Sequence, residues 1–168
     1  MVGGYTEAIP ELDALADRVD AWLTANRCGS VYEVGCAKGY VVAQLRERGY
    51  HARGCDISQY AVDAAPPLVR PLIEVASATD LPWGNNAFAA CVASNVLEHL
   101  DEAGVTQALR EMGRVSERQY IEVPTDRDPN FDHDPSHVTQ RPLEWWEAQC
   151  RAAGLQDFAV VATETLIG

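Results

Sequence analysis

The stretch Ser30-Val31-Tyr32-Glu33-Val34-Gly35-Cys36-Ala37-Lys38-Gly39 decides the fold of this chain. Its first five residues are rich in β-branched and aromatic side chains, which predicts a short strand. Gly35 and Gly39 then predict a tight turn whose backbone a ligand can approach closely. Apolar residues at helical spacing follow over residues 40–48. A strand, a glycine turn and a helix in this order are typical of the nucleotide-binding unit of many α/β folds.

Outward from this stretch, expected strands and helices alternate along the chain. The nearly all-apolar run 87–94 predicts a central strand that is buried on both faces. Such alternation implies a mostly parallel sheet with helices on both faces, a doubly wound, Rossmann-like α/β fold. Further strands are expected at residues 52–56, 72–76, 120–123 and 158–163, and further helices at residues 10–26, 58–65, 101–114 and 142–153.

The length and charge of the chain limit the number of domains and the kinds of partner. Its 168 residues support a single domain over 1–168, with an N-terminal helical cap over 1–29. A long polar loop is expected over 125–141, on the substrate side, because loops of this length inside domains are usually functional. Thirteen basic and 25 acidic residues give a formal net charge of −12, which disfavours nucleic-acid binding through phosphate repulsion.

Compartment and membrane association can also be read from composition. No apolar run reaches about 18 residues, so no membrane span is expected. The first residues lack a basic start followed by an apolar stretch, so no signal peptide is expected. The five cysteines form no C-x-x-C pair. We therefore expect reduced thiols and a cytoplasmic protein.

Two acidic residues indicate what kind of ligand the glycine turn binds. Asp56 ends the second expected strand, 21 residues after Gly35, where a carboxylate can accept hydrogen bonds from a ribose diol. Glu33 stands two residues before Gly35 and would repel a pyrophosphate. The third glycine expected of a dinucleotide site is also missing. These features point away from NAD and towards S-adenosylmethionine, whose sulfonium and ammonium groups are positive.

At this point the sequence resembles the class I S-adenosylmethionine-dependent methyltransferases over roughly residues 30–155. Residues 31–39 look like the family's first motif, with Ala37 where glycine is commoner. Residues 54–58 look like the ribose-binding end of the second strand, and 78–82 like the adenine-contacting segment. Residues 88–100 are similar to the fourth strand and following helix of the branch called methyltransferase type 11.

The resemblance implies a sheet of six or seven strands and a cofactor site at the strand ends. The family's sheet usually closes with a hairpin of a sixth and a seventh strand, whereas this chain ends at Gly168, just after the sixth. The seventh strand would then be lost, supplied by a partner, or replaced by another pairing. The residues implied to bind the cofactor are Glu33 at the ammonium, Gly35, Cys36 and Gly39 along the methionine, Asp56 at the ribose, Ile57, Thr79 and Asp80 at the adenine, and Ser94 and Asn95 beside the methyl group.

Three histidines are the candidate catalytic residues. His99 follows the fourth strand, and His133 and His137 lie in the long loop. A histidine over the acceptor site could remove the proton of a hydroxyl acceptor. Two alternatives stay open: the histidines are hydrogen-bonded fixtures, or positioning of the acceptor carries most of the rate.

A metal site is a further alternative, because Glu98 and the same three histidines offer nitrogen and oxygen ligands. The arrangement is similar to that of the metal-dependent small-RNA 2′-O-methyltransferases, which place Glu-x-x-Glu-His on this helix. This chain has Asn95 where the first of those glutamates would stand, and it lacks a basic surface for RNA.

We therefore expect methyl transfer from S-adenosylmethionine to a small molecule, with a hydroxyl favoured over nitrogen or carbon. One rival interpretation is a non-catalytic partner subunit that binds the cofactor or has lost it. Another is a methyltransferase fold that runs a different reaction, such as a cyclisation. An open sheet edge would also suit a second copy of the chain or a protein partner, while no nucleic acid and no membrane partner is expected.

Overall fold

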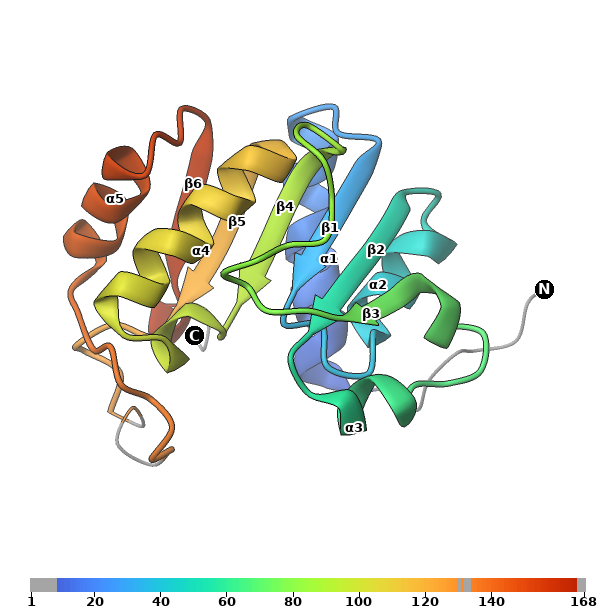
Figure 1. The fold of residues 1–168 in the computed structure, drawn as a ribbon, viewed down its shortest axis with the longest axis horizontal. Coiled ribbons are helices and arrows are strands. Elements are labelled where there is room, and N and C mark those ends of the chain that lie inside the picture. The colour runs from blue at the N-terminus through green and yellow to red at the C-terminus, as the bar shows by residue number, and fades with distance from the viewer. Residues whose placement is uncertain (1–8, 130, 132–133, 166–168) are drawn as a thin grey trace.

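The computed structural model describes residues 9–129, 131 and 134–165 of the chain (Figure 1). Its centre is a sheet of six strands in the order β3-β2-β1-β4-β5-β6, and every neighbouring pair runs parallel. The predicted α/β fold is therefore confirmed. The strands are β1 (Ser30–Val34), β2 (His51–Asp56), β3 (Ile73–Val75), β4 (Phe88–Ser94), β5 (Ser116–Val123) and β6 (Phe158–Ala162).

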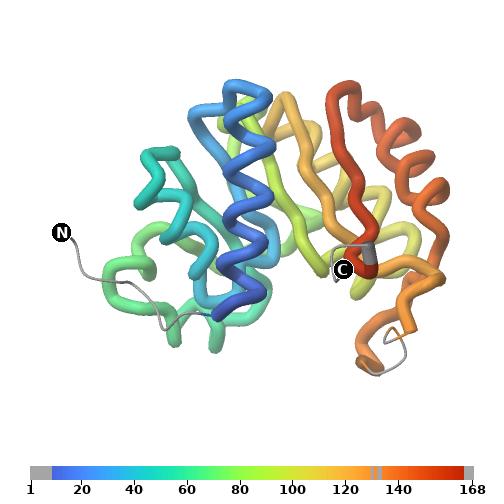
Figure 2. The backbone as a smooth tube through the Cα atoms, turned by 180° about the vertical axis from the view of Figure 1, so that it is seen from behind, coloured from blue at the N-terminus to red at the C-terminus, as the bar shows by residue number. Residues whose placement is uncertain are grey.

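Helices cover both faces of this sheet. The helices are α1 (Pro10–Ala25), α2 (Tyr40–Glu47), α3 (Gln59–Asp63), α4 (Glu102–Val115) and α5 (Leu143–Ala152). Helices α4 and α5 lie on the face seen in Figure 1, and α1 crosses the opposite face in Figure 2. Because side chains alternate along a strand, Val31 packs in the α1 and α2 core while Tyr32 packs in the α4 and α5 core.

The end of the sheet differs from the family pattern that the resemblance implied. Strand β6 pairs directly with β5, in parallel, from Gln119 opposite Phe158 to Val123 opposite Ala162. Within the described part of the chain the sheet thus has six strands, and β6 occupies the edge. Strand β5 also begins at Ser116, four residues before the expected start, because Ser116 pairs with Phe88 at the beginning of β4.

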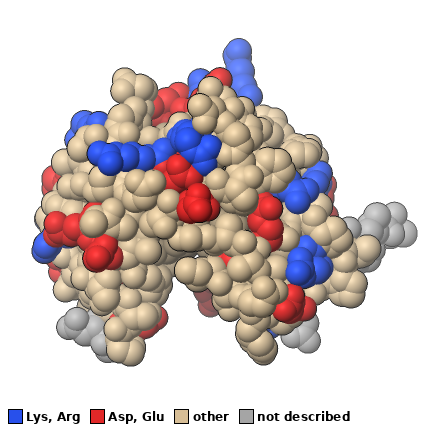
Figure 3. Space-filling model, in the orientation of Figure 1, with Lys and Arg blue, Asp and Glu red and all other residues tan. Residues whose placement is uncertain are grey.

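The carboxyl ends of the parallel strands meet at one edge of the sheet, at the bottom of Figure 1. The loop between β5 and α5 hangs below this edge, and the N-terminal end of α1 reaches the same edge from behind (Figure 2). The space-filling view shows a notch there between the two halves of the molecule (Figure 3). None of the helices in the described ranges is long and apolar enough to cross a membrane.

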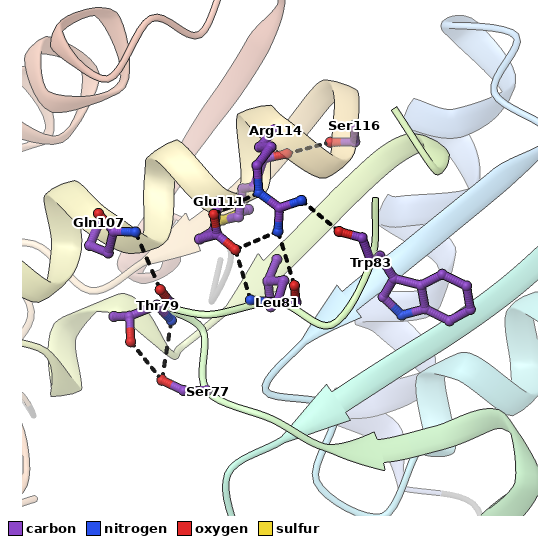
Figure 4. A network of polar contacts seen from close by, with 9 residues as sticks. Ser77, Thr79, Leu81, Trp83, Gln107, Glu111, Arg114 and Ser116 are labelled. Atoms are coloured by element: carbon purple, nitrogen blue, oxygen red, sulfur yellow. Dashed lines mark hydrogen bonds and ion pairs between the residues drawn. The ribbon is translucent and has the colours of Figure 1, made fainter. Parts of the chain in front are cut away.

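A polar network fastens the segment after β3 to helix α4 (Figure 4). The Arg114 guanidinium donates to the carbonyl oxygens of Leu81 and Trp83 and to the carboxylate of Glu111, at 2.6–2.9 Å. Glu111 in turn accepts the backbone N–H of Leu81 at 2.8 Å. This network fixes the course of the chain next to residues 76–78, which form one wall of the site.

Replacing Arg114 with Ala should lower the free energy of unfolding by about 2–3 kcal/mol, because the mostly buried Glu111 and two carbonyl groups lose their donor. Arg110→Ala is the matched control, since Arg110 is exposed on the same helix and should cost less than about 0.5 kcal/mol. Urea unfolding measures both. Equal losses in the two variants would contradict the role given to the network.

The ion pair between Arg114 and Glu111 predicts that the stability of the protein depends on pH. The Arg114 guanidinium lowers the pKa of Glu111 below its usual value. A carboxyl with a lowered pKa contributes stability above its unfolded-state pKa and loses that contribution as the pH falls. The stability difference between wild type and Arg114→Ala should therefore shrink as the pH is lowered through the acidic range.

Candidate functional site

The turn after β1 adopts the left-handed conformations that its glycines allow. Gly35, Ala37 and Gly39 have φ angles of 74°, 47° and 75°. The N–H of Ala37 donates to Oδ2 of Asp56 at 2.8 Å, and the N–H of Cys36 donates to the carbonyl oxygen of Cys55 at 2.9 Å. The end of β2 therefore fixes the position of the turn. Ala37 adopts a backbone conformation that glycine would adopt more easily.

A first cavity of about 280 Å³ lies between the ends of β2 and β4. Oδ1 of Asp56 accepts the N–H of Ser58 at 2.8 Å, so each carboxylate oxygen of Asp56 keeps a lone pair for a ligand. Ile57 leaves 76% of its surface exposed, although it is apolar. The lining side chains include Asp56, Ile57, Ser77, Asn95 and His99.

A second cavity of about 400 Å³ lies on the other side of the glycine turn, beneath α1. Glu33 lines this cavity and is only 6% exposed, and its Oε2 has no hydrogen-bond partner among the described residues. Burial raises the pKa of Glu33 to about 8. A buried carboxyl with a free oxygen is suited to a cationic group, which would compensate the charge that burial disfavours.

These two cavities fit the cofactor that the resemblance implied. They share Gly35 and Asn95, so they form one elongated cleft around the turn. An apolar surface at Ile57, a carboxylate at Asp56 and an unpartnered buried carboxyl at Glu33 match an adenine, a ribose and an ammonium group respectively. The buried side chain of Cys36 lines the second cavity. Because burial raises the pKa of its thiol, Cys36 contributes a small, uncharged part of the cavity wall.

Replacing Glu33 with Gln tests, in the protein without ligand, whether Glu33 is buried with a raised pKa. The folded state keeps a proton on Glu33 that the unfolded chain releases above its ordinary pKa of 4.5, so rising pH costs stability. Wild type should lose roughly 2–4 kcal/mol more than Glu33→Gln between about pH 5 and 9. Denaturant unfolding at several pH values measures this loss, with the exposed Glu47→Gln as control. Parallel curves for wild type and Glu33→Gln would contradict the burial argument.

A third cavity of about 440 Å³ opens between α1 and the ends of β4 and β5. Its walls include Ala14 and Arg18 of α1, and it shares Leu12, Leu15, Ser94 and Asn95 with the second cavity. Asn95, with a φ angle of 52°, lines all three cavities. The strand end of β4 is therefore the point at which the cavities meet.

Glu122 lies in the wall of the third cavity but has no free capacity for a ligand. Its carboxylate, 1% exposed, accepts two hydrogen bonds from Arg18, one from the Tyr120 hydroxyl and one from the Ser94 hydroxyl, at 2.8–3.0 Å. Glu122 thus positions Arg18 and Ser94. Sequence reasoning missed this contact, because 104 residues separate Arg18 from Glu122 and no local pattern joins them.

The predicted residues fall into two groups in the structure. The first group lines the cavities: it consists of Asp56, Ile57, Ser94, Asn95 and the predicted residues of the glycine turn except Gly39. The N–H of Gly39 instead donates to the carbonyl of Cys36 within the turn. Thr79 and the exposed Asp80 are not among the residues lining the first cavity; Ser77 and Ala78 are. Backbone hydrogen bonds and the Ser77 hydroxyl tie Thr79 and Asp80 back onto Ser77.

Of the three predicted histidines, two lie at the site. His99 lines the first cavity, and His137 lies against it with ring centroids 4.8 Å apart. The Nε2 atoms of His99 and His137 lie 4.0 and 3.9 Å from Oε1 of Glu98, and that of His137 also lies 3.7 Å from Oδ2 of Asp134. Burial raises the pKa of Glu98 to about 7. His133 lies outside the described residues.

Comparisons with known proteins agree with this fold. A family model described as a methyltransferase domain matches residues 32–119. Nothing among the curated proteins matches significantly. The YcgJ protein from Bacillus subtilis is 19% identical, with a TM-score of 0.66 over 82% of this chain and 67% of that one. A SAM-dependent methyltransferase from Archaeoglobus fulgidus is 21% identical, with a TM-score of 0.64 over 84% and 70%.

A structural neighbour of another activity is the [4+2]-cyclase SpnF. It is 24% identical, with a TM-score of 0.64, and this chain covers 57% of its length. These likenesses to solved structures concern the fold, while the family match runs from within β1 to within β5 and includes every residue that lines the first cavity.

Proposed function

The chain belongs to the methyltransferase domain family, and from this premise we propose that it transfers a methyl group to a hydroxyl of a small molecule. S-adenosylmethionine is the cofactor, and when bound it supplies an electrophilic methyl group on its sulfonium. The observation that carries the proposal is the meeting of three cavities at Asn95. Two of them suit the parts of the cofactor, and the third has the size of a small-molecule site.

The residues of the cleft would bind and orient the cofactor. Asp56 would accept hydrogen bonds from the ribose hydroxyls, since its oxygens keep free lone pairs. Glu33 would hold the ammonium, and Ile57 would pack on the adenine face. Binding along the turn would direct the methyl group towards Asn95, where the third cavity begins.

The third cavity supports a small acceptor. It is bounded by α1 on one side and by Ser94 and Glu122 on the other. The net charge of −12 argues against a nucleic acid. The five cysteines are buried and free, which is consistent with a reducing compartment such as the cytoplasm.

A hydroxyl acceptor has to lose its proton near the methyl group. Glu98, His99 and His137 gather their oxygen and nitrogen atoms at the border of the first cavity, which meets the third cavity at Asn95. This gathering of proton-accepting atoms supports a hydroxyl over a carbon acceptor. The in-line approach of acceptor and methyl group would come from the walls of the cleft.

The test compares two tryptophan substitutions on helix α1. Ala14 lines the third cavity alone, whereas Ala21 is exposed seven residues later on the same helix and lines none of the three. A panel of small alcohols, phenols and sugars is incubated with S-adenosylmethionine, and S-adenosylhomocysteine release is measured. We expect release with a hydroxyl compound in wild type and Ala21→Trp. Ala14→Trp should lose it while keeping its cofactor affinity.

Two outcomes would contradict the proposal. Full turnover by Ala14→Trp would exclude the third cavity as the acceptor site. Methylation confined to amine or carbon acceptors would exclude the hydroxyl assignment.

A further inference from the structure

A buried carboxylate without partners lies just below β4. Glu98, in the short 3-10 helix η2 (Leu97–His99), is fully buried. Neither Oε1 nor Oε2 has a hydrogen-bond partner among the described residues. Charged groups in protein interiors are normally paired or coordinate a metal ion, because desolvation is otherwise too costly. Glu98 therefore either keeps a proton or is compensated by a cation.

Two imidazole rings face this carboxylate without touching it. The Nε2 atoms of His99 and His137 lie 4.0 and 3.9 Å from Oε1 of Glu98. Both distances exceed the roughly 3.2 Å limit of ordinary N–H···O hydrogen bonds. The three ligand atoms all lie within 4.8 Å of one another, so they surround a common point. A tetrahedral ion with bonds of about 2.1 Å holds its ligands roughly 3.4 Å apart. The atoms would have to move closer by about half an ångström where they lie 3.9–4.0 Å apart, and by more where they lie up to 4.8 Å apart.

The outer nitrogens of both rings are occupied by hydrogen bonds that define their tautomers. Nδ1 of His137 lies 3.0 Å from the carbonyl oxygen of Phe131, which can only accept, so this nitrogen carries the proton. The Ser136 hydroxyl donates to Asp134 at 2.5 Å and so accepts from Nδ1 of His99 at 2.9 Å. Both Nε2 lone pairs are then free and lie close to Glu98, and that of His137 also lies 3.7 Å from Oδ2 of Asp134. Histidine ligands of metal ions are oriented in this way.

The two chain segments that carry these ligands are joined independently of the imidazoles. The N–H groups of Val138 and Thr139 donate to the backbone carbonyl of Glu98 at 2.9 and 3.0 Å. The Thr139 hydroxyl donates to the carbonyl oxygen of Leu100 at 2.6 Å. The loop after β5 is thus fastened to η2, and the three side chains are held close together before any ion binds.

We propose that Glu98, His99 and His137 form a binding site for one divalent transition-metal ion. Two imidazole nitrogens and one carboxylate oxygen suit Zn²⁺, Co²⁺ or Fe²⁺ better than Mg²⁺ or Ca²⁺, which prefer oxygen ligands. Because His99 also lines the first cavity, the site borders the cleft. The site goes beyond the proposed function, since it is defined by these contacts whatever the acceptor is.

Direct titration tests the site without any assay of methyl transfer. The full chain, prepared without a polyhistidine tag and freed of metal with a chelator, is titrated with Zn²⁺ by calorimetry and with Co²⁺ by visible absorption. We expect one ion per chain and much weaker binding of Mg²⁺. Glu98→Gln and His99→Ala should each weaken Co²⁺ binding by roughly 100-fold or more. His51→Ala, at an exposed histidine at the start of β2, should leave it unchanged.

The outcomes separate this proposal from its main rival, an ion pair between Glu98 and charged histidines. Wild-type protein that binds neither Zn²⁺ nor Co²⁺ at one site per chain would overturn the metal site. So would a His99→Ala protein with wild-type affinity, and this variant remains informative if Glu98→Gln fails to fold, because the His99 side chain is 35% exposed. Cofactor affinity is measured separately, so failure of the metal site would leave the proposed methyl transfer standing, and the reverse also holds.

Discussion

Gly35→Ala protein is expected to lose S-adenosylmethionine binding and about 2–5 kcal/mol of stability. Gly35 has a φ angle of 74°, which an L side chain rarely adopts. A Cβ atom there would lie 2.2 Å from Cγ2 of Val96, so either the turn or the start of η2 has to shift. Because Gly35 borders both cavities that suit the cofactor, either shift alters the cleft.

Calorimetry and urea unfolding measure the two effects. Gly29→Ala is the matched control, because an added Cβ at Gly29 meets no atom within 4 Å. It should bind the cofactor like wild type. A Gly35→Ala protein with normal affinity would mean that the cofactor does not lie along this turn.

Asp56→Ala is expected to weaken S-adenosylmethionine binding by about 10- to 150-fold, which corresponds to about 1.5–3 kcal/mol for hydrogen bonds to a charged group. Asp56 would otherwise accept from the ribose, and its Oδ2 also holds the turn through the N–H of Ala37. Asp63→Ala removes the same charge from an exposed position on α3 and should leave the affinity unchanged.

A third variant separates the two roles of Asp56. Asp56→Asn keeps one acceptor oxygen, so its affinity should fall between those of wild type and Asp56→Ala. Unchanged affinity in a folded Asp56→Ala protein would show that the ribose binds elsewhere.

Local patterns were sufficient to predict most of the elements. Glycine and strand spacing predicted β1 and its turn, and the apolar run 87–94 predicted the buried β4, because these signals depend on neighbours in the chain. Helices were also expected from residues 58 and 101, and the side chains of Ser58 and Asp101 each accept a backbone N–H at the start of the helix that follows. The start of β5 was missed because Ser116 joins the sheet through its pairing with β4, which is not a local property.

The parts of the site that depend on contacts between distant residues were harder to predict from the sequence. Leu12 and Leu15 line two of the cavities, yet their spacing indicates only an amphipathic helix. The segment after β3 was assigned to the adenine by resemblance, but its turn directs Ser77 and Ala78, and not Thr79 or Asp80, to the cavity wall. Glu98 and His137 come together only through the course of the loop after β5.

The account is tested most directly by calorimetric titration of the full chain with S-adenosylmethionine, S-adenosylhomocysteine and NAD. The central claim is that the cleft around Gly35 takes a cofactor with a ribose and a cationic amino-acid end. It predicts saturable binding of both sulfur compounds in the micromolar range and no binding of NAD, which has no ammonium group for Glu33 and whose pyrophosphate lacks the third glycine of a dinucleotide site. Absence of heat with both sulfur compounds, or equally tight binding of NAD, would contradict it.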